Sequence, residues 1–291
     1  MVADTKQIKI LLLGGGYTLA RLAARLNPNH FVITTTSLEK QAYFLSLGYN
    51  CAIMRGESTA SVKEVVSKFS GINLIVDSIP PLKQEKPLAG VENVISTTSK
   101  LSIKRFIYLS TSGVFGSSDG EIVTEESAAN PYSESATYRY ESEQSYHLAF
   151  GNRLTVLRIS GIYGPGRGVG VMLKQGRYTV VEDQDRWSNR IHVDDLVEII
   201  LRSIDLKKYP SLPPVMNASD SCPAKVGDLI KYYLRQFDLP EPTFISREEA
   251  KQQGRERLFL NQRLSNTLVK EILDLNFKFP SYIEGAGEEF K

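Results

Sequence analysis

The amino-acid sequence predicts an α/β protein with a doubly wound parallel sheet and a small C-terminal lobe. Three observations lead to this fold class. Short apolar runs alternate with amphipathic helical patterns through the first two-thirds of the chain, and each run is continuous rather than alternating. Continuous apolar runs are typical of parallel strands that are covered on both faces. Directly after the first run comes a group of glycines, "LLLGGG", where such folds change from strand to helix.

The predicted strands follow one another at intervals that leave room for a crossover helix between them. They are the segments 8–13, 30–36, 51–54, 73–79, 105–110 and 154–159. Between the first two strands an apolar face recurs at helical spacing, on Leu19, Leu22, Ala23 and Leu26. We expect Asn27-Pro28 to end that helix. A later helix is expected over residues 135–148.

The pattern changes after Gly161, where the glycine-rich segment "GIYGPGRGVG" begins. A helix over 193–206 and a strand over 214–217 are expected to return to the main sheet. The sequence therefore predicts a dinucleotide-binding domain over residues 1–161, joined by 193–217. Residues 162–192 and 218–291 are predicted to form the smaller, substrate-side lobe.

Composition excludes several classes of function. The 291 residues carry a net charge of +2, and no Lys/Arg cluster interleaves with aromatic residues, so nucleic-acid binding is not expected. No run approaches the ~18 apolar residues that span a bilayer, so no membrane association is expected. Cys51 and Cys222 have no partners at metal-ligand spacing, so neither a metal site nor a disulfide framework is predicted. A cytoplasmic location is the default prediction, and an organellar one stays open.

The first glycines predict a phosphate-binding turn. Gly14 and Gly16 fit the first two positions of a G-x-G-x-x-G turn, where the backbone bends sharply and approaches a pyrophosphate. Leu19 stands at the third glycine position. The predicted cofactor-binding residues here are Gly14, Gly15, Gly16, Tyr17 and Thr18. The alternative is a tight connection without a ligand, but strand, glycines and helix arrive in the order of a Rossmann-type fold.

The tip of the second strand favours NADP over NAD. NAD-binding folds usually place an Asp or Glu there for the ribose hydroxyls. This chain has Thr36 and Ser37, followed by Lys40, which suit a 2′-phosphate. Glu39 is the competing candidate for an NAD-type contact, and the threonines are also simply good strand formers.

Several motifs in order resemble the extended short-chain dehydrogenase/reductase family, the NAD-dependent epimerase/dehydratase group. They are "FIYLSTSGVFG" (106–116), "LRISGIYGPGR" (157–167), "NRIHVDDLV" (189–197) and "VMNASDSCPAKVGDLIKYY" (215–233), with the glycine turn before them. The resemblance covers nearly the whole chain. It implies a nicotinamide cofactor and a small-molecule substrate, and Ile79 and Pro80 then belong to the wall beside the adenine and ribose.

The same resemblance implies two catalytic positions. Thr111 falls where the family places its catalytic Ser or Thr, and Tyr138 is the best-placed tyrosine on the following helix. The family's Tyr-x-x-x-Lys pair is incomplete, because the fourth residue after Tyr138 is Ser142, and Tyr132 and Tyr140 give no lysine either. A lysine there lowers the pKa of the phenol and holds the ribose. Arg139 is one residue from Tyr138, about 100° around the helix, so it faces elsewhere. Two substitutes for the lysine stay open, Arg139 and a lysine from a distant loop.

Other polar residues have competing interpretations. His192 is expected to be a core histidine, with Asp194 or Asp195 capping the next helix. Ser188 stands where sugar-nucleotide epimerases carry an arginine, which makes a UDP-sugar substrate less expected. Four arginines either line an anionic pocket or form a solvated face: Arg167, Arg177, Arg186 and Arg190.

Two functions therefore stay open. The first is an NADP-dependent oxidoreductase or epimerase-like enzyme that acts on a small carbonyl or hydroxyl substrate, as a monomer or homodimer. The second is a dinucleotide-binding module whose catalysis has lapsed and which senses or binds a partner. Both occur on one fold, so the fold alone does not choose between them.

Overall fold

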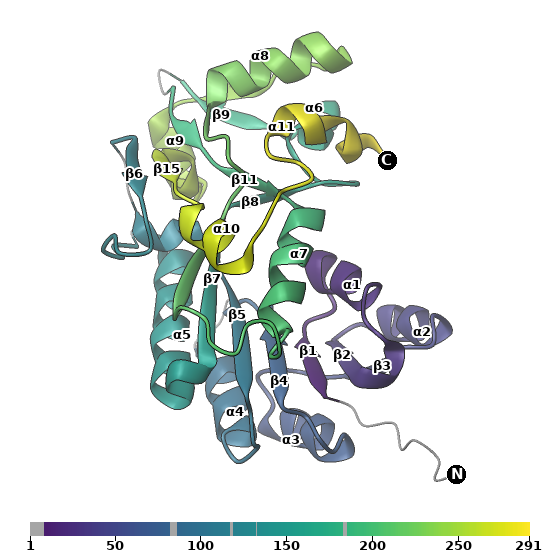
Figure 1. Ribbon diagram of the computed structural model, residues 1–291. Helices are drawn as coiled ribbons and strands as arrows, with labels where there is room; N and C mark the ends of the chain where they lie inside the picture. The colour runs from purple at the N-terminus through teal and green to yellow at the C-terminus, as the bar shows by residue number, and fades with distance from the viewer. Residues whose placement is uncertain (1–8, 82–85, 117–118, 132, 183–184) are drawn as a thin grey trace. The chain divides into compact units, whose positions relative to one another are not determined.

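The structure is a computed structural model, and it describes residues 9–81, 86–116, 119–131, 133–182 and 185–291. Within these ranges seven strands form one sheet in the order β12-β7-β5-β4-β1-β2-β3 (Figure 1). Their bounds are β1 Ile10–Leu13, β2 Phe31–Thr35, β3 Asn50–Ile53, β4 Leu74–Asp77, β5 Arg105–Thr111, β7 Leu154–Ile159 and β12 Val215–Ala218.

The pairing of these strands confirms the predicted α/β fold. β1 pairs in parallel with both β2 and β4, β2 with β3, and β4 with β5. The chain first builds the sheet outward from β1 to β3 and then returns to build the other side from β4. The strand order thus reverses between β1 and β4, and ligands of doubly wound sheets bind outside the carboxyl ends of the strands at such a point.

One face of the sheet is buried by three helices, α3 Thr59–Lys68, α4 Ala89–Thr98 and α5 Glu134–Phe150. Side chains that alternate along the strands, such as Leu11 and Phe106, pack there with Val94 and Tyr146. The rings of Phe106 and Tyr146 lie 4.6 Å apart, centroid to centroid. This packing fixes α5, whose own sequence is mostly polar, against the sheet.

The predicted strands agree with the structure to within one or two residues at each end, with Ile8 outside the described residues. The first helix is shorter than predicted. α1 spans Tyr17–Ala23, because Arg25 and Leu26 donate their N–H groups to carbonyls three residues back, which tightens the last turn. The other helices of this part are α2 Leu38–Ser46 and the 3-10 helices η1 Pro28–His30 and η3 Gly151–Arg153.

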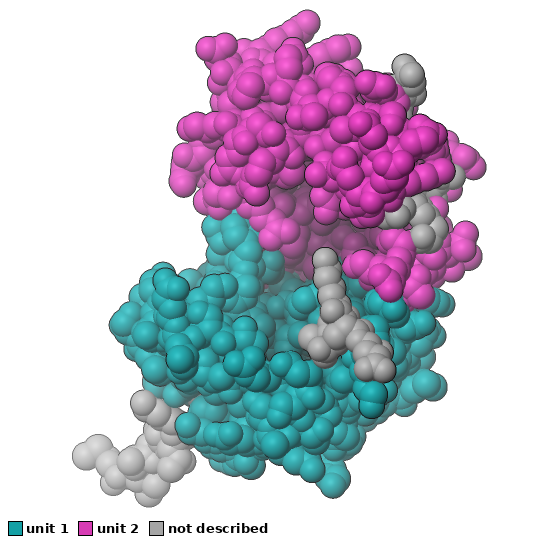
Figure 2. All heavy atoms as spheres, turned by 180° about the vertical axis from the view of Figure 1, so that it is seen from behind, with its two compact units in different colours: residues 1–110, 138–157, 200–215 teal, residues 111–137, 158–199, 216–291 magenta. Residues whose placement is uncertain are grey.

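The chain forms two compact units, coloured separately in Figure 2. The first comprises residues 1–110, 138–157 and 200–215, and the second comprises 111–137, 158–199 and 216–291. α7 Val193–Ile204 contributes to both. The predicted functional division at residues 161, 193 and 217 stays a prediction.

The second unit is built from short elements. Four two-stranded sheets pair β8 Gly161–Tyr163 with β11 Arg190–His192, β9 Thr179–Val181 with β14 Thr243–Ile245, β10 Trp187–Ser188 with β13 Ala224–Lys225, and β6 Glu121–Val123 with β15 Gln262–Leu264. Its further helices are α6 Val169–Lys174, α8 Val226–Phe237, α9 Arg247–Gln252, α10 Thr267–Leu273 and α11 Tyr282–Gly285, with the 3-10 helices η2 Ser112–Phe115, η4 Glu256–Phe259 and η5 Ala286–Phe290.

The buried Glu289 fixes the end of the chain in this unit. Its carboxylate accepts the N–H groups of Gly170 and Val171, at 2.7 and 3.3 Å, and the hydroxyl of Tyr233. Burial raises the pKa of Glu289 to about 7.

None of the helices in the described ranges is both long and apolar enough to cross a membrane.

Candidate functional site

The glycine turn lies at the point where the strand order reverses. Gly14 has a φ of +94°, a conformation that side chains disfavour. A Cβ atom on Gly14 would lie 2.9 Å from the Ser78 hydroxyl and 3.4 Å from Cγ1 of Ile79. The turn is held by Thr34, whose hydroxyl accepts the Gly14 N–H at 3.0 Å, and by Ser78, whose hydroxyl donates to the Leu13 and Gly14 carbonyls. Gly14 and Ile79, both predicted site residues, therefore lie beside each other.

The remaining glycines of the turn serve two different purposes. A Cβ on Gly15 would lie 2.7 Å from the Phe44 ring, so this glycine allows α2 to pack closely. A Cβ on Gly16 would have no atom within 4 Å, so its backbone is open to an approaching group. Gly16 precedes α1, where the Tyr17 ring stacks on the Arg21 guanidinium at 3.8 Å and Thr18 is buried. A backbone turn with an open Gly16 fits a pyrophosphate.

The tip of β2 presents polar groups around the start of α2. Thr36 is exposed after the strand ends. The Ser37 hydroxyl caps α2 by accepting the Lys40 N–H at 3.2 Å. Lys40 and Glu39 are both exposed on the first turn of that helix. The structure thus brings Thr36, Ser37 and Lys40 together, and leaves the competing Glu39 beside them.

At the carboxyl end of β4, a buried carboxyl group holds the wall segment. Asp77 accepts the Ile79 N–H at 2.8 Å and the Tyr146 hydroxyl at 2.6 Å. Burial raises the pKa of Asp77 to about 6, although these hydrogen bonds and the charge of Arg139 oppose the shift. Ile79 is half-buried and Pro80 is exposed after it. Asp77 was not singled out from the sequence, because its partner Tyr146 is 69 residues away along the chain.

Arg139 reaches the same edge of the sheet from α5. Its Nη1 lies 3.0 Å from the Leu109 carbonyl, 3.2 Å from the Tyr108 hydroxyl and 3.4 Å from the Ile79 carbonyl. Because Ile79 also lies beside Gly14, the glycine turn, Ile79 and the guanidinium follow one another along this edge of the sheet in one continuous line. Arg139, which the sequence offered as a substitute for the family's lysine, thus places a cation at the ends of β4 and β5.

The sequence feature that could have placed Arg139 at the lysine position is its spacing of four residues from Ser135. Four residues before Arg139 stands Ser135, which is exposed on the same helix. If Arg139 is aligned with the lysine of Tyr-x-x-x-Lys, Ser135 falls at the position of the tyrosine. Counted from Tyr138, the fourth residue is Ser142, which is 0% exposed and donates its hydroxyl to the Tyr138 carbonyl at 2.7 Å. Tyr132 lies outside the described residues.

The predicted Thr111 belongs to the second unit, whereas Tyr138 belongs to the first, and both remain predictions. Thr111 ends β5, and its hydroxyl oxygen accepts the Gly113 N–H at 3.1 Å. Accepting this bond leaves the hydroxyl proton available for another group. The adjacent Ser112 carbonyl accepts the Gln262 side-chain amide at 3.0 Å, which fixes this end of β5 within the second unit.

His192 is a core histidine, as predicted, with 0% exposure and its ring 3.8 Å from that of Phe279. The prediction that Asp194 or Asp195 caps α7 was wrong. The imidazole itself accepts the Asp194 N–H at 3.2 Å, and the Asp195 carboxylate instead accepts the N–H groups of Lys278 and Phe279.

The four arginines that the sequence offered for an anionic pocket differ in exposure and in partners. Arg167 and Arg177 are exposed. Arg190 is buried, donates to the Ser188 hydroxyl at 2.7 Å and lies over the Tyr282 ring, and Arg186 donates to the Leu260 carbonyl.

These features define a class of protein. A doubly wound parallel sheet with a glycine turn at its reversal point is the fold of dinucleotide-binding proteins. In agreement, the model of the NAD dependent epimerase/dehydratase family matches residues 81–217 of the chain. This match covers just under half of the chain and supports the resemblance that the motifs indicated, and the chain has the NAD(P)-binding fold of that family.

Similar proteins extend over most of the chain. Protein YeeZ of Escherichia coli (strain K12) is 25% identical over 205 residues, which are 66% of this chain and 71% of that protein. The structure of a functionally unknown conserved protein from Silicibacter pomeroyi DSS is 27% identical, with a TM-score of 0.79 and 97% of each chain covered. UDP-glucuronic acid 4-epimerase from Bacillus cereus, solved in complex with NAD, shares the fold at 16% identity, with a TM-score of 0.75 and coverage of 96% of this chain and 97% of that one.

Proposed function

We propose that the protein is an NADP-dependent oxidoreductase or epimerase-like enzyme that acts on a small carbonyl or hydroxyl compound, as a monomer or homodimer. The observation that carries this proposal is the continuous line from Gly14 through Ile79 to Arg139 at the reversal point of the sheet. In doubly wound folds this line is where a dinucleotide lies. The NAD complex of the Bacillus cereus enzyme supports a nicotinamide coenzyme on the same fold.

The residues of the first unit suit the parts of that coenzyme. The backbone of Gly14–Gly16, with Tyr17 and Thr18 behind it, receives the pyrophosphate. Ile79 and Pro80 line the adenine and ribose. Thr36, Ser37 and Lys40 receive a 2′-phosphate, and this arrangement supports NADP over NAD, although Glu39 stands beside them.

The reaction that this site supports is hydride exchange between coenzyme and substrate. The Thr111 hydroxyl would donate a hydrogen bond to the substrate oxygen, and Tyr138 would transfer to that oxygen the one proton that it gains on reduction. Arg139 would hold the nicotinamide ribose in place of the lysine. A guanidinium does not lose its proton in proteins, so Arg139 orients and charges the site without relaying a proton.

A second candidate function is a dinucleotide-binding module without catalysis. It is favoured by the spacing on α5, where the cation at residue 139 has Ser135 in place of the family's tyrosine. A serine hydroxyl is a much weaker acid than a phenol, so the proton donor of the family is missing at that position. The protein would then bind the coenzyme and change its interactions with a partner.

A turnover assay separates the two functions. The purified chain is mixed with NADPH and a panel of small aldehydes and ketones, and the oxidation of NADPH is followed beside the Thr111→Val and Tyr138→Phe variants. The enzyme proposal predicts turnover that falls at least ten-fold in each variant. Binding of NADPH without turnover of any compound supports the module, and turnover that is unchanged in both variants removes the catalytic assignment.

A further inference from the structure

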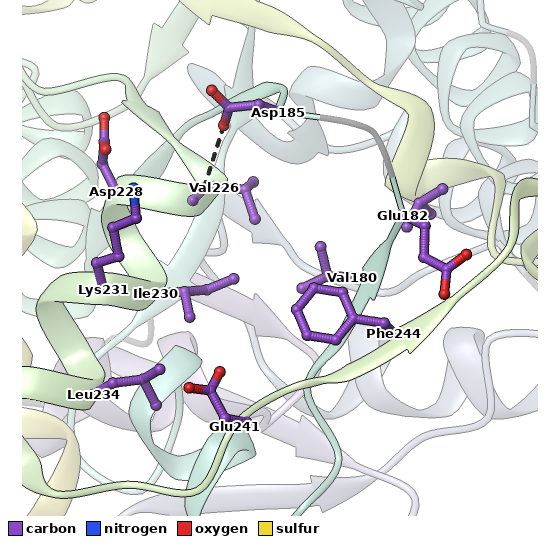
Figure 3. A pocket seen from close by; sticks show the side chains of 12 residues that line it. Val180, Glu182, Asp185, Val226, Asp228, Ile230, Lys231, Leu234, Glu241 and Phe244 are labelled. Atoms are coloured by element: carbon purple, nitrogen blue, oxygen red, sulfur yellow. Dashed lines mark hydrogen bonds between the residues drawn. The ribbon is translucent and has the colours of Figure 1, made fainter.

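The second unit contains a groove that the proposed function does not use. It lies between α8 and the two-stranded sheet of β9 and β14 (Figure 3). Its volume of about 840 Å³ is within the range of sites that hold a ligand or a short peptide segment. All of its lining residues belong to the second unit.

The walls of the groove are apolar. α8 contributes Ile230 and Leu234, which stand one helical turn apart, and the sheet contributes Val180 and Phe244. Figure 3 shows Ile230, Val180 and Phe244 turned toward the same space. Such a lining gives a bound apolar side chain partners on both sides.

Phe244 is not needed for the core of its own unit. Along β14 the side chains alternate, and Ile245 is the one that packs inward, with Val181, Ala250 and Phe259. Phe244 remains 54% exposed. A large aromatic ring exposed beside a groove is typical of an interaction site, because covering it removes apolar surface from water.

The rim of the groove is acidic. Among the described residues four carboxylates line it beside one lining amine, Lys231, and Lys225 pairs with one of these acids, Asp185. The four carboxylates are Glu182, Asp185, Asp228 and Glu241. This negative rim stands on a chain whose net charge is +2. It disfavours anions such as nucleotides and favours a cationic ligand.

The acids occupy separate points around the groove. Figure 3 shows Asp185 near the start of α8 and Glu241 beside Leu234, on the opposite side of the apolar walls. Asp185 is fixed there, because it accepts the Gly227 N–H at 3.3 Å and its carboxylate lies 4.0 Å from Nζ of Lys225, which offsets its charge. A single ammonium group would meet one of these carboxylates at a time, whereas basic residues spaced along a peptide would meet several.

We propose that this groove binds a segment of a partner protein in which Lys or Arg residues flank apolar side chains. The apolar side chains would fill the space between Phe244 and Ile230, and the basic residues would pair with the acids of the rim. This interaction does not depend on coenzyme binding.

The test uses the full chain and a fluorescein-labelled peptide of sequence KKLFKLIKK, with fluorescence anisotropy at physiological salt. Two further peptides replace all lysines by glutamate, or all apolar residues by serine. The protein variants are Phe244→Ala and Glu241→Lys, with Glu248→Lys as the matched control, because Glu248 is exposed on α9 outside the groove. Melting temperature and NADPH affinity are measured for each variant to show that it is folded.

We expect saturable binding of KKLFKLIKK that weakens about ten-fold in Phe244→Ala, through lost apolar contact, and about ten-fold in Glu241→Lys, through reversed charge. Glu248→Lys should bind the peptide as tightly as the wild type, and the two altered peptides should bind the wild type much more weakly. The proposal is overturned if the peptide does not bind, if Glu248→Lys weakens binding as much as Glu241→Lys, or if the glutamate peptide binds equally well. Displacement by phenethylamine at a similar concentration would instead identify a small-molecule site. Concentration-dependent dimerisation that Phe244→Ala abolishes would identify a second copy of the chain as the occupant.

Discussion

Replacing Arg139 by methionine tests whether this guanidinium stands in for the family's lysine. Methionine keeps the length and apolar stem of the side chain but removes the charge and the donors. Nη1 carries two protons and has three acceptors at 3.0–3.4 Å, so the wild type makes two of these bonds at a time. At about 1.5 kcal/mol for each charged hydrogen bond, the variant loses about 3 kcal/mol of stability. For a chain of this size that lowers the melting temperature by about 5 °C.

The same variant has a second expected effect, on coenzyme affinity. If Arg139 holds the nicotinamide ribose, its loss removes a charged hydrogen bond and weakens NADPH binding by about ten-fold or more. Titration calorimetry and thermal unfolding of the purified variant measure the two effects separately. Arg139→Lys should retain most of the affinity, because an ammonium on the same helical position keeps the charge.

A matched control for this variant is Arg153→Met. Arg153 is also a half-buried arginine that donates to backbone carbonyls, those of Phe150 and Ile103, but these lie away from the carboxyl ends of β4 and β5. It should lower the melting temperature and leave NADPH affinity unchanged. Equal losses of affinity in the two variants, or no loss in Arg139→Met, would refute the assignment of Arg139 to the site.

Three further perturbations follow from the site. Gly14→Ala should abolish coenzyme binding and destabilise the fold by about 1–3 kcal/mol, measured by denaturant unfolding. The reason is that φ of Gly14 is +94° and the new Cβ would lie 2.9 Å from the Ser78 hydroxyl. Wild-type coenzyme affinity in this variant would contradict the described turn. Lys40→Ala should lower the ratio of NADP to NAD affinity about five-fold while Glu39→Gln does not, and calorimetry with both coenzymes would expose the opposite result. Asp77→Asn should flatten the dependence of the free energy of unfolding on pH. Burial raises the pKa of Asp77 in the folded protein to about 6 from its ordinary value of 3.8. This carboxyl therefore contributes most to stability below pH 4, and its contribution declines by about 3 kcal/mol as the pH rises through 6. Parallel unfolding curves for wild type and Asp77→Asn from pH 4 to 7 would argue against a buried, titrating carboxyl.

The sequence was sufficient for the architecture of the sheet. Strands buried on both faces must be continuously apolar, so runs such as those at 105–110 and 154–159 are recognisable without knowledge of their neighbours. The glycine turn was predictable for a similar reason, since only glycine readily adopts the φ that Gly14 has.

The arrangement of the site was less predictable, because it depends on contacts between distant segments. The carboxyl of Asp77 has its partner in Tyr146, and Arg139 is held by the carbonyls of Ile79, after β4, and Leu109, in β5; no local sequence pattern encodes these contacts. Counting from Tyr138 gave Ser142 at the position of the lysine and left Arg139 as a substitute whose place the sequence did not specify. The packing of α5 on the sheet places the side chains of Arg139 and Tyr146, and this packing depends on residues throughout the first unit.

Calorimetric titration of the full chain with NADPH and with NADH tests the central claim most directly. The account predicts saturable binding of one coenzyme per chain, tighter for NADPH, and lost in Gly14→Ala. A well-folded protein that takes up neither coenzyme would contradict it.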